Sequence, residues 1–255
     1  MPVHQVADSG FDAEAASYER ARPGYPPDCV SWFAEHLGIA PGRTVLDLAT
    51  GTGKLTRLLE PAGARLIAAE PVDGMRAVLH ATSPAVPLVS STAEQLPFAS
   101  GSLDAIVVAQ AFHWFDAPPA LEEAARALRA GGRLGLVWNA RDRTDPRVDA
   151  LWSIMDRVEK RAPWRQHEEW RESAFTDTPF FGPLHEATFH HEQVMTIDEV
   201  VDRFRSVSHV AVLPAAEKEA VLAEVRACAL EHADPADPEH FPIPYRVDAY
   251  WCETA

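Results

Sequence analysis

Cysteine is scarce in this chain. Its 255 residues include three cysteines, Cys29, Cys228 and Cys252, which lie far apart and form no CxxC pair. This spacing excludes the disulfide framework of a small secreted domain and offers no zinc-binding pattern. Two adjacent histidines, His190 and His191, fall on a predicted strand and must face opposite sides, so they cannot chelate one metal ion. We therefore expect no metal site and a reducing compartment.

Long apolar runs are also absent. The first residues, MPVHQVADSGFD, lack the positive start and the apolar stretch of a signal peptide. No uninterrupted apolar stretch approaches the roughly 20 residues that a spanning helix needs. These absences predict a soluble, cytoplasmic protein that does not enter a membrane.

Basic residues are outnumbered by acidic ones. The chain has 23 lysines and arginines against 38 aspartates and glutamates, a net charge of -15. Such a charge repels phosphate backbones and anionic membrane surfaces. The balance favours a small-molecule partner over nucleic acid, and it leaves open whether the protein is a monomer or a homodimer.

The first half of the chain alternates short apolar runs with helical stretches. This order is typical of an α/β fold with a parallel sheet and crossover helices. The predicted strands are 43–49, 65–70, 86–90, 103–109 and 132–138, and the predicted helices are 53–62, 72–82 and 117–129. We expect Gly131 and Gly132 to end the last of these helices.

The second half has a different pattern. It contains a helical stretch at 145–162, a predicted strand at 184–194, two further helices at 196–207 and 214–231, and a final alternating run, YRVDAYWC. A late pair of strands that closes an otherwise parallel sheet would make one domain with a helical cap. We therefore predict a single domain over 1–255.

A glycine-rich turn follows the first predicted strand, in VLDLATGTGKLT at 45–56. A phosphate-binding loop needs a Ser or Thr directly after its lysine, but Lys54 is followed by Leu55. A dinucleotide-binding turn needs a third small residue where this chain has Thr56, so that match is weak. Asp47, before the glycines, would disfavour pyrophosphate but could pair with an ammonium group.

The turn resembles the first motif of the class I S-adenosylmethionine-dependent methyltransferases. In that family an acid precedes alternating glycines, and this chain has Asp47, Ala49, Gly51 and Gly53 there. Ala49 stands where the family most often has glycine, and we expect its small size to be tolerated. Further segments match later motifs of the family in the right order, over about 11–140: EPVDGM, STAEQLPF, GSLDAIVVAQAFHWFD and LRAGGRLGLVW.

This resemblance implies the fold and the cofactor. It implies a Rossmann-like, mostly parallel seven-stranded sheet with the last strand antiparallel, helices on both faces and a helical cap. The cofactor would be S-adenosyl-L-methionine, with S-adenosyl-L-homocysteine as the product. The chain would divide into an N-terminal lid helix at 1–30, a cofactor-binding core at 40–140, cap insertions with the late strand at 140–240, and the final strand at 241–255.

The resemblance also assigns site residues. Asp47 would meet the ammonium group, Glu70 the ribose hydroxyls and Met75 the adenine ring. The full set of predicted cofactor contacts is Tyr18, Arg22, Asp47, Ala49, Gly51, Gly53, Glu70, Met75, Ala93, Glu94 and Gln110. Alternatives remain for several of them, since Met75 could belong to the core and Tyr18 and Arg22 to an ordinary amphipathic helix.

Three segments are similar to the small-molecule branch that includes trans-aconitate methyltransferases. They are SYERARPGYP, AFHWF and VWNARD. This similarity predicts in-line transfer of a methyl group to an oxygen, nitrogen or carbon nucleophile. His113 is the candidate general base, and Trp114, Asn139 and Arg141 are candidate acceptor contacts. His113 and Trp114 could instead pack the lid, and Arg141 could belong to an exposed, salt-bridged segment.

Two other functions stay open from the residues. An NAD-dependent oxidoreductase could use a similar sheet, although Thr56 argues against it. A protein could also bind S-adenosylmethionine without transferring its methyl group.

Overall fold

The structure is a computed structural model that describes residues 19, 22–159, 174–176 and 178–255. Tyr18 and most of the predicted lid at 1–30 lie outside these residues. Of the helices within them, none is both long and apolar enough to span a bilayer.

A seven-stranded sheet forms the centre of the molecule. Its strands are β1 (Thr44–Leu48), β2 (Arg65–Ala69), β3 (Leu88–Val89), β4 (Leu103–Ala109), β5 (Leu128–Arg141), β6 (His185–Thr196) and β7 (His240–Glu253). Their order is β3-β2-β1-β4-β5-β7-β6. β1 to β5 pair in parallel, and β7 runs antiparallel to both β5 and β6. The predicted Rossmann-like sheet with an antiparallel last strand is therefore confirmed.

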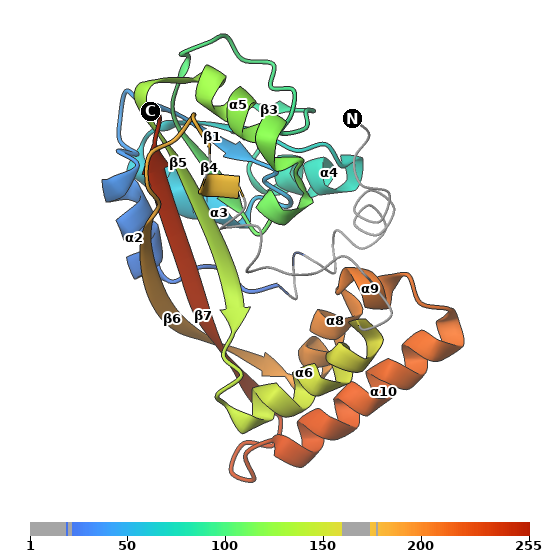
Figure 1. The fold of residues 1–255 in the computed structure, drawn as a ribbon. Helices are drawn as coiled ribbons and strands as arrows, with labels where there is room; N and C mark the ends of the chain where they lie inside the picture. Colours follow the sequence, from blue (N-terminus) through green and yellow to red (C-terminus); the bar gives the residue numbers. More distant parts are fainter. Residues whose placement is uncertain (1–18, 20–21, 160–173, 177) are drawn as a thin grey trace.

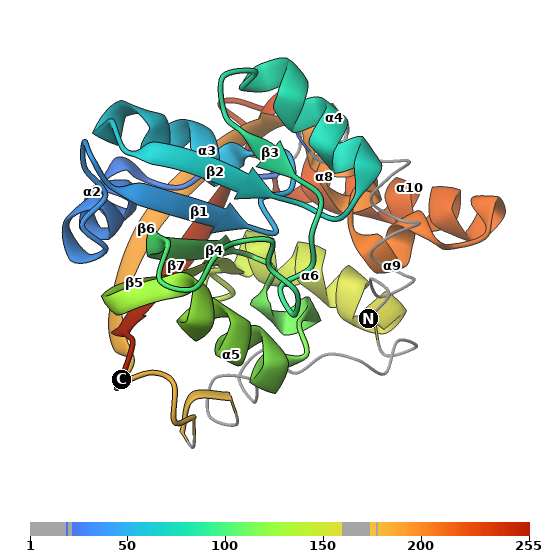
Figure 2. The ribbon, with the colours of Figure 1, turned by 90° about the horizontal axis from the view of Figure 1, so that it is seen from above.

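Helices cover both faces of this sheet (Figure 2). α2 (Pro27–His36), α3 (Lys54–Leu59) and α4 (Asp73–Thr82) lie on one face, and α5 (Ala117–Ala127) lies on the other. α5 is amphipathic, because Ala120, Leu121, Ala124 and Ala127 recur at helical spacing and are all buried. The crossover helices leave one edge of the sheet, where the parallel strands end, open to ligands. We call it the carboxyl edge.

The cap is built from α6 (Pro146–Glu159), α8 (Ile197–Arg205), α9 (Ser208–Ala211) and α10 (Ala215–His232). It has its own apolar core, in which the rings of Trp152 and Phe204 lie 4.8 Å apart. The long strands β6 and β7 run from the sheet into the cap and contribute Met195 and Phe241 to that core (Figure 1). These strands join the cap to the sheet.

The predicted end of the helix at 117–129 is wrong. α5 ends at Ala127, and Gly131 and Gly132 lie inside β5 instead. Pairing of β4 with β5 skips from Leu128 to Arg133 at this point, which makes the glycines part of a bulge. Gly131 has φ +69°, a conformation that glycine adopts without strain. β5 is consequently longer than the predicted strand at 132–138.

The boundary of the predicted lid also differs from the structure. Residues 27–30 begin α2, whose Cys29 and Phe33 are fully buried against the sheet. Pro27 suits the first helical position because its missing N–H has no partner to lose there. Residues 27–30 are therefore part of α2.

Candidate active site

The glycine turn connects β1 to α3 at the carboxyl edge. Gly51 has φ +59°, and a Cβ atom placed on it would meet nothing within 4 Å. Gly53 has φ +83°, and its Cβ atom would lie 2.2 Å from Cδ1 of Leu79 in α4. Gly51 therefore borders open space that a ligand can fill, whereas Gly53 lets two helices pack closely.

Ala49 adopts a left-handed backbone conformation, with φ +54°. The small size of Ala49 was the reason to expect that alanine can replace glycine here. The left-handed backbone conformation restricts the residue type more strictly than size does. A residue with a Cβ atom costs roughly 1–2 kcal/mol in this region, a cost that glycine avoids. Backbone strain of this kind often lies at functional sites.

Asp47 is fully buried at the end of β1. Its Oδ2 accepts hydrogen bonds from the hydroxyl groups of Thr50, at 2.9 Å, and Thr56, at 2.5 Å. Burial raises the pKa of Asp47 to about 6, although these hydrogen bonds act in the opposite direction. The sequence analysis treated Thr56 only as an argument against NAD and missed its role as a partner of Asp47.

Glu70, directly after β2, bonds to the glycine turn and to the residue before α4. Its Oε2 accepts the backbone N–H of Gly51 and its Oε1 accepts that of Val72, each at 2.9 Å. Burial raises the pKa of Glu70, and the backbone hydrogen bonds oppose that shift. Each carboxylate oxygen has a second lone pair, so hydroxyl groups of a ligand can still bind here.

Several buried polar atoms along the carboxyl edge have no hydrogen-bond partner in the described part of the chain. They are Oδ1 of Asp47, Oγ1 of Thr52 and Oγ of Ser91, which follows β3. Unsatisfied buried polar groups are rare in folded proteins and costly. A polar ligand at this edge would supply the missing partners, and S-adenosylmethionine carries the amino, carboxylate and hydroxyl groups to do so. Thr52 and Ser91 were not predicted as site residues.

The predicted adenine contacts come from α4 and from the segment after β3. Met75 in α4 and Ala93 after β3 are buried. Glu94 is half-buried, and its Oε1 accepts the backbone N–H of Asp116 at 2.9 Å. That bond fixes Glu94 at the start of α5.

The turn after β4 carries the predicted acceptor residues. Gln110 has φ +60°, and its N–H donates to the carbonyl oxygen of Val137 at 2.9 Å. His113 and Trp114 are half-buried in the short helix that follows. Nε1 of Trp138 lies 3.5 Å from Nδ1 of His113, at the outer limit of a hydrogen bond. Because indole nitrogen only donates, Nδ1 of His113 is the acceptor in this contact, which favours the tautomer with the ring proton on Nε2.

Asn139 and Arg141 are engaged with other parts of the protein. Nδ2 of Asn139 donates to the carbonyl oxygen of Gly24 at 2.9 Å, and its Oδ1 accepts from Nε2 of His191 at 3.0 Å. The guanidinium of Arg141 lies 5.2 Å from the ring centre of Trp152, over the ring face. Asn139 thus holds the N-terminal segment, and Arg141 holds the base of the cap.

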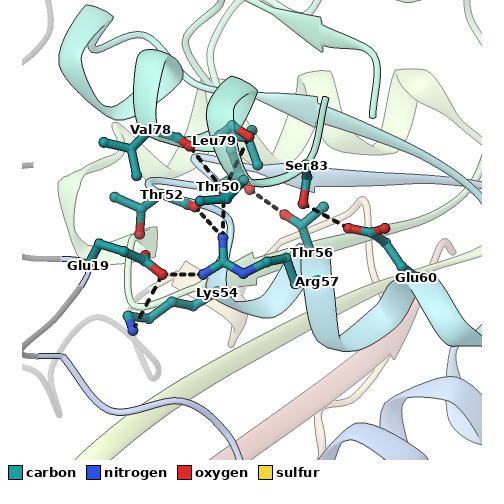
Figure 3. A network of polar contacts seen from close by, with 11 residues as sticks. Glu19, Thr50, Thr52, Lys54, Thr56, Arg57, Glu60, Val78, Leu79 and Ser83 are labelled. Atoms are coloured by element: carbon teal, nitrogen blue, oxygen red, sulfur yellow. Dashed lines mark hydrogen bonds and ion pairs between the residues drawn. The ribbon is translucent and has the colours of Figure 1, made fainter. Parts of the chain in front are cut away.

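Glu19 lies next to the glycine turn (Figure 3). It forms an ion pair with Arg57 and lies 3.9 Å from Nζ of Lys54, both in α3. Arg57 also donates to the carbonyl oxygen of Thr52 at 2.8 Å. Farther along the chain, Nη2 of Arg22 donates to the carbonyl oxygen of Ser206 at 2.9 Å. The N-terminal segment therefore links α3 to the cap.

Comparison with known proteins shows the family of this chain. Residues 46–136 match the family described as the methyltransferase domain. A protein of Mycobacterium tuberculosis (strain ATCC 25618 / H37Rv), named an uncharacterized methyltransferase, is 35% identical over 240 residues. The match covers 92% of this chain and 91% of that protein.

Solved structures share the fold. The YcgJ protein from Bacillus subtilis has a TM-score of 0.57 at 19% identity, over 89% of this chain and 97% of that one. Phosphoethanolamine N-methyltransferase 2 of Haemonchus contortus, in complex with phosphomonomethylethanolamine and S-adenosylhomocysteine, has a TM-score of 0.58 at 15% identity, over 99% and 60%. The chain belongs to the class I S-adenosylmethionine-dependent methyltransferases, as its glycine turn and later motifs predicted.

Proposed function

We propose that this methyltransferase binds S-adenosylmethionine through Asp47, Gly51 and Glu70 at the carboxyl edge. The observation that carries this proposal is the unpartnered, buried Oδ1 of Asp47 beside the open space over Gly51. Oδ1 would accept the ammonium group of the ligand, because a charge-assisted hydrogen bond best offsets the burial of a carboxylate. Glu70 would accept the ribose hydroxyls through its remaining lone pairs.

Met75, Ala93 and Glu94 would enclose the adenine ring. Met75 and Ala93 are buried and apolar, so they suit the faces of a flat ring. One oxygen of Glu94 is bonded to Asp116, which holds the carboxylate in place for a second bond.

We propose a small molecule as the acceptor, enclosed between the turn at 110–114 and the cap. The net charge of -15 disfavours nucleic acid as an alternative acceptor. The cofactor supplies an activated methyl group on a sulfonium, so the chain itself needs mainly to align the acceptor and exclude water. Such alignment contributes up to roughly 7–11 kcal/mol in well-oriented reactions.

His113 would orient the acceptor as a hydrogen-bond donor. In a neutral imidazole whose Nδ1 accepts from Trp138, the proton is on Nε2, and that nitrogen would donate to the acceptor. General-base catalysis by His113 would require the other tautomer and the loss of this contact. Trp114 would line the acceptor space, with Asn139 and Arg141 supporting it from β5.

The free thiols of Cys29, Cys228 and Cys252 support the proposal of a cytoplasmic location.

The N-terminal segment would cover the cofactor, with Glu19 next to the turn and Arg22 against the cap.

Titration calorimetry with S-adenosylmethionine, S-adenosylhomocysteine and NAD tests the proposed cofactor site. We expect both sulfur ligands to bind and NAD to give no heat. Failure of both sulfur ligands would refute the proposed site, and binding of NAD in their place would favour the oxidoreductase alternative.

A further inference from the structure

Among the residues that the structure describes, Arg203 is a buried cation that the proposed cofactor site does not use. It lies in α8, with 4% of its surface exposed. Its Nε is buried without a hydrogen-bond partner, and no hydrogen bond or ion pair of its guanidinium occurs within the described residues. Arginine is almost never fully buried unless it is paired. An anion bound to Arg203 would therefore lower the energetic cost of burying its charge.

Arg203 does not belong to the apolar core of the cap. That core is contacted by Phe204, whose ring packs on Trp152. Consecutive residues of an α-helix point about 100° apart, so Arg203 points to a different side of α8. Ser206, one turn later on that side, is also buried, and its carbonyl oxygen accepts from Arg22. The end of α8, one turn after Arg203, is thus contacted by Arg22.

The end of α8 and the start of α3 are contacted by two residues that are close in the sequence. Glu19 contacts Lys54 at the start of α3, and Arg22, three residues later, contacts Ser206 at the end of α8. Three residues of extended chain span at most about 11 Å. In Figure 1, α8 and α9 form the side of the cap nearer to α4. The helix that carries Arg203 is therefore on the side of the cap nearer to the proposed cofactor site.

The charges around Arg203 distinguish it from its neighbour on the same helix. Arg205 is half-buried and contacts Asp202 and Glu219 at 3.4 Å and 3.3 Å. Arg203 has no such carboxylate within the described residues, although the chain contains 38 acidic residues. Burying an uncompensated charge is costly, and a ligand that carries an oxyanion removes that cost.

We propose that Arg203 binds an oxyanion, a carboxylate or a phosphate group, of the methyl acceptor. The planar guanidinium can donate two parallel hydrogen bonds to either group. This inference rests on the proposed function, because it assumes that the acceptor is enclosed between the cap and the cofactor. It narrows the acceptor to an anionic small molecule.

The test is calorimetry on the full-length protein. The protein is first saturated with S-adenosylhomocysteine, and citrate or inorganic phosphate is then titrated into it at matched ionic strength. We expect at least one of them to bind, and the Arg203→Met variant to bind it about tenfold or more weakly. Arg203→Lys should recover part of the affinity, because it restores the charge without the bidentate geometry. Preference for citrate indicates a carboxylate, and preference for phosphate indicates a phosphate group.

Arg205→Met is the matched control, since it removes a paired arginine from the same helix. It should leave anion binding within twofold of wild type, a negligible energy difference of about 0.4 kcal/mol. Thermal unfolding without anion separates binding from structure. Arg203→Met should unfold at the same or a higher temperature than wild type, because it removes an uncompensated buried charge.

Three outcomes would overturn the inference: no binding of either anion to the wild type, equal weakening by Arg203→Met and Arg205→Met, or a lower unfolding temperature of Arg203→Met with unchanged anion affinity. Binding of S-adenosylhomocysteine, measured first, keeps the proposals apart. If it binds and the anions do not, only the inference about Arg203 fails. If it does not bind, the proposed cofactor site fails.

Discussion

The hydroxyl group of Thr56 lies 2.5 Å from Oδ2 of Asp47, deep under the glycine turn. Thr56 lies in the first turn of α3 and Asp47 is the residue before the last of β1, so the bond connects the two ends of the glycine turn. The hydrogen bond from Thr56 uses Oδ2 of Asp47, and Oδ1 has no partner in the described structure. Thr56 is therefore a positioning residue for the carboxylate that we propose binds the ligand.

Replacing Thr56 with valine keeps the shape and removes the hydroxyl group. We expect the affinity for S-adenosylhomocysteine to fall by about tenfold, because one lost hydrogen bond to a charged group costs roughly 1.5–3 kcal/mol. Calorimetry measures the change, and Thr56→Ser, which keeps the hydroxyl group, should bind like the wild type. Equal affinity of the valine and serine variants would show that the hydroxyl group has no such role.

Stability should depend on pH through Asp47. Its pKa is raised from 3.8 to about 6 in the folded protein, so the folded state binds this proton more tightly than the unfolded state. The resulting stabilisation is complete below about pH 4 and is lost as the pH rises through about 6.

The Asp47→Asn variant cannot lose this proton and isolates the effect. Its free energy of unfolding, relative to wild type, should rise by up to about 3 kcal/mol between about pH 4 and pH 7. Urea unfolding of both proteins without ligand measures the difference. Burial, the largest cause of the raised pKa of Glu70, is common to both proteins, and the variant removes only the smallest cause, the charge of Asp47. A difference that stays constant with pH would contradict the raised pKa of Asp47.

Ala49→Gly should stabilise the protein. It removes the left-handed strain of roughly 1–2 kcal/mol and adds about 0.5–1 kcal/mol of chain entropy in the unfolded state. The expected net gain is about 0.5–1 kcal/mol, measured by urea unfolding. The same substitution at Ala34, inside α2, should instead destabilise by about 1 kcal/mol. Loss of stability in both variants would show that the backbone of Ala49 is not strained.

The parallel half of the fold could be predicted because each of its elements has a local signal. β1, β2 and β4 lie within two residues of the predicted strands, since buried parallel strands are short, continuous apolar runs. Gly131 and Gly132 misled the prediction, because a glycine pair signals a helix end and a bulge equally well. Only the pairing of β4 with β5 separates the two.

The positions of Asp47 and Glu70 could be predicted from the sequence, because each acid comes at the end of a short apolar run that forms a strand. Contacts between distant segments could not be predicted. The bond of Asn139 to Gly24 and the stacking of Arg141 on Trp152 depend on where the cap and the N-terminal segment pack. The burial of Arg203, whose Nε has no partner among the described residues, could not be foreseen either, because burial of a single helix position is a tertiary property.

The tautomer of His113 can be measured without knowing the acceptor. Nitrogen chemical shifts in the labelled protein should show a protonated Nε2 and an unprotonated Nδ1, because Trp138 donates to Nδ1. The Trp138→Phe variant, which lacks the indole N–H, should show a larger population of the other tautomer. A proton on Nδ1 in the wild type would restore Nε2 as a candidate base.

The affinity of the Asp47→Asn variant for S-adenosylhomocysteine, measured by calorimetry at neutral pH, tests the central claim most directly. The variant keeps the size of the side chain and replaces the carboxylate with an amide, so the ammonium group loses its charged partner. We predict a dissociation constant at least about tenfold above that of the wild type, with Glu70→Gln weakened as well. An affinity of Asp47→Asn within about twofold of the wild type would contradict the account.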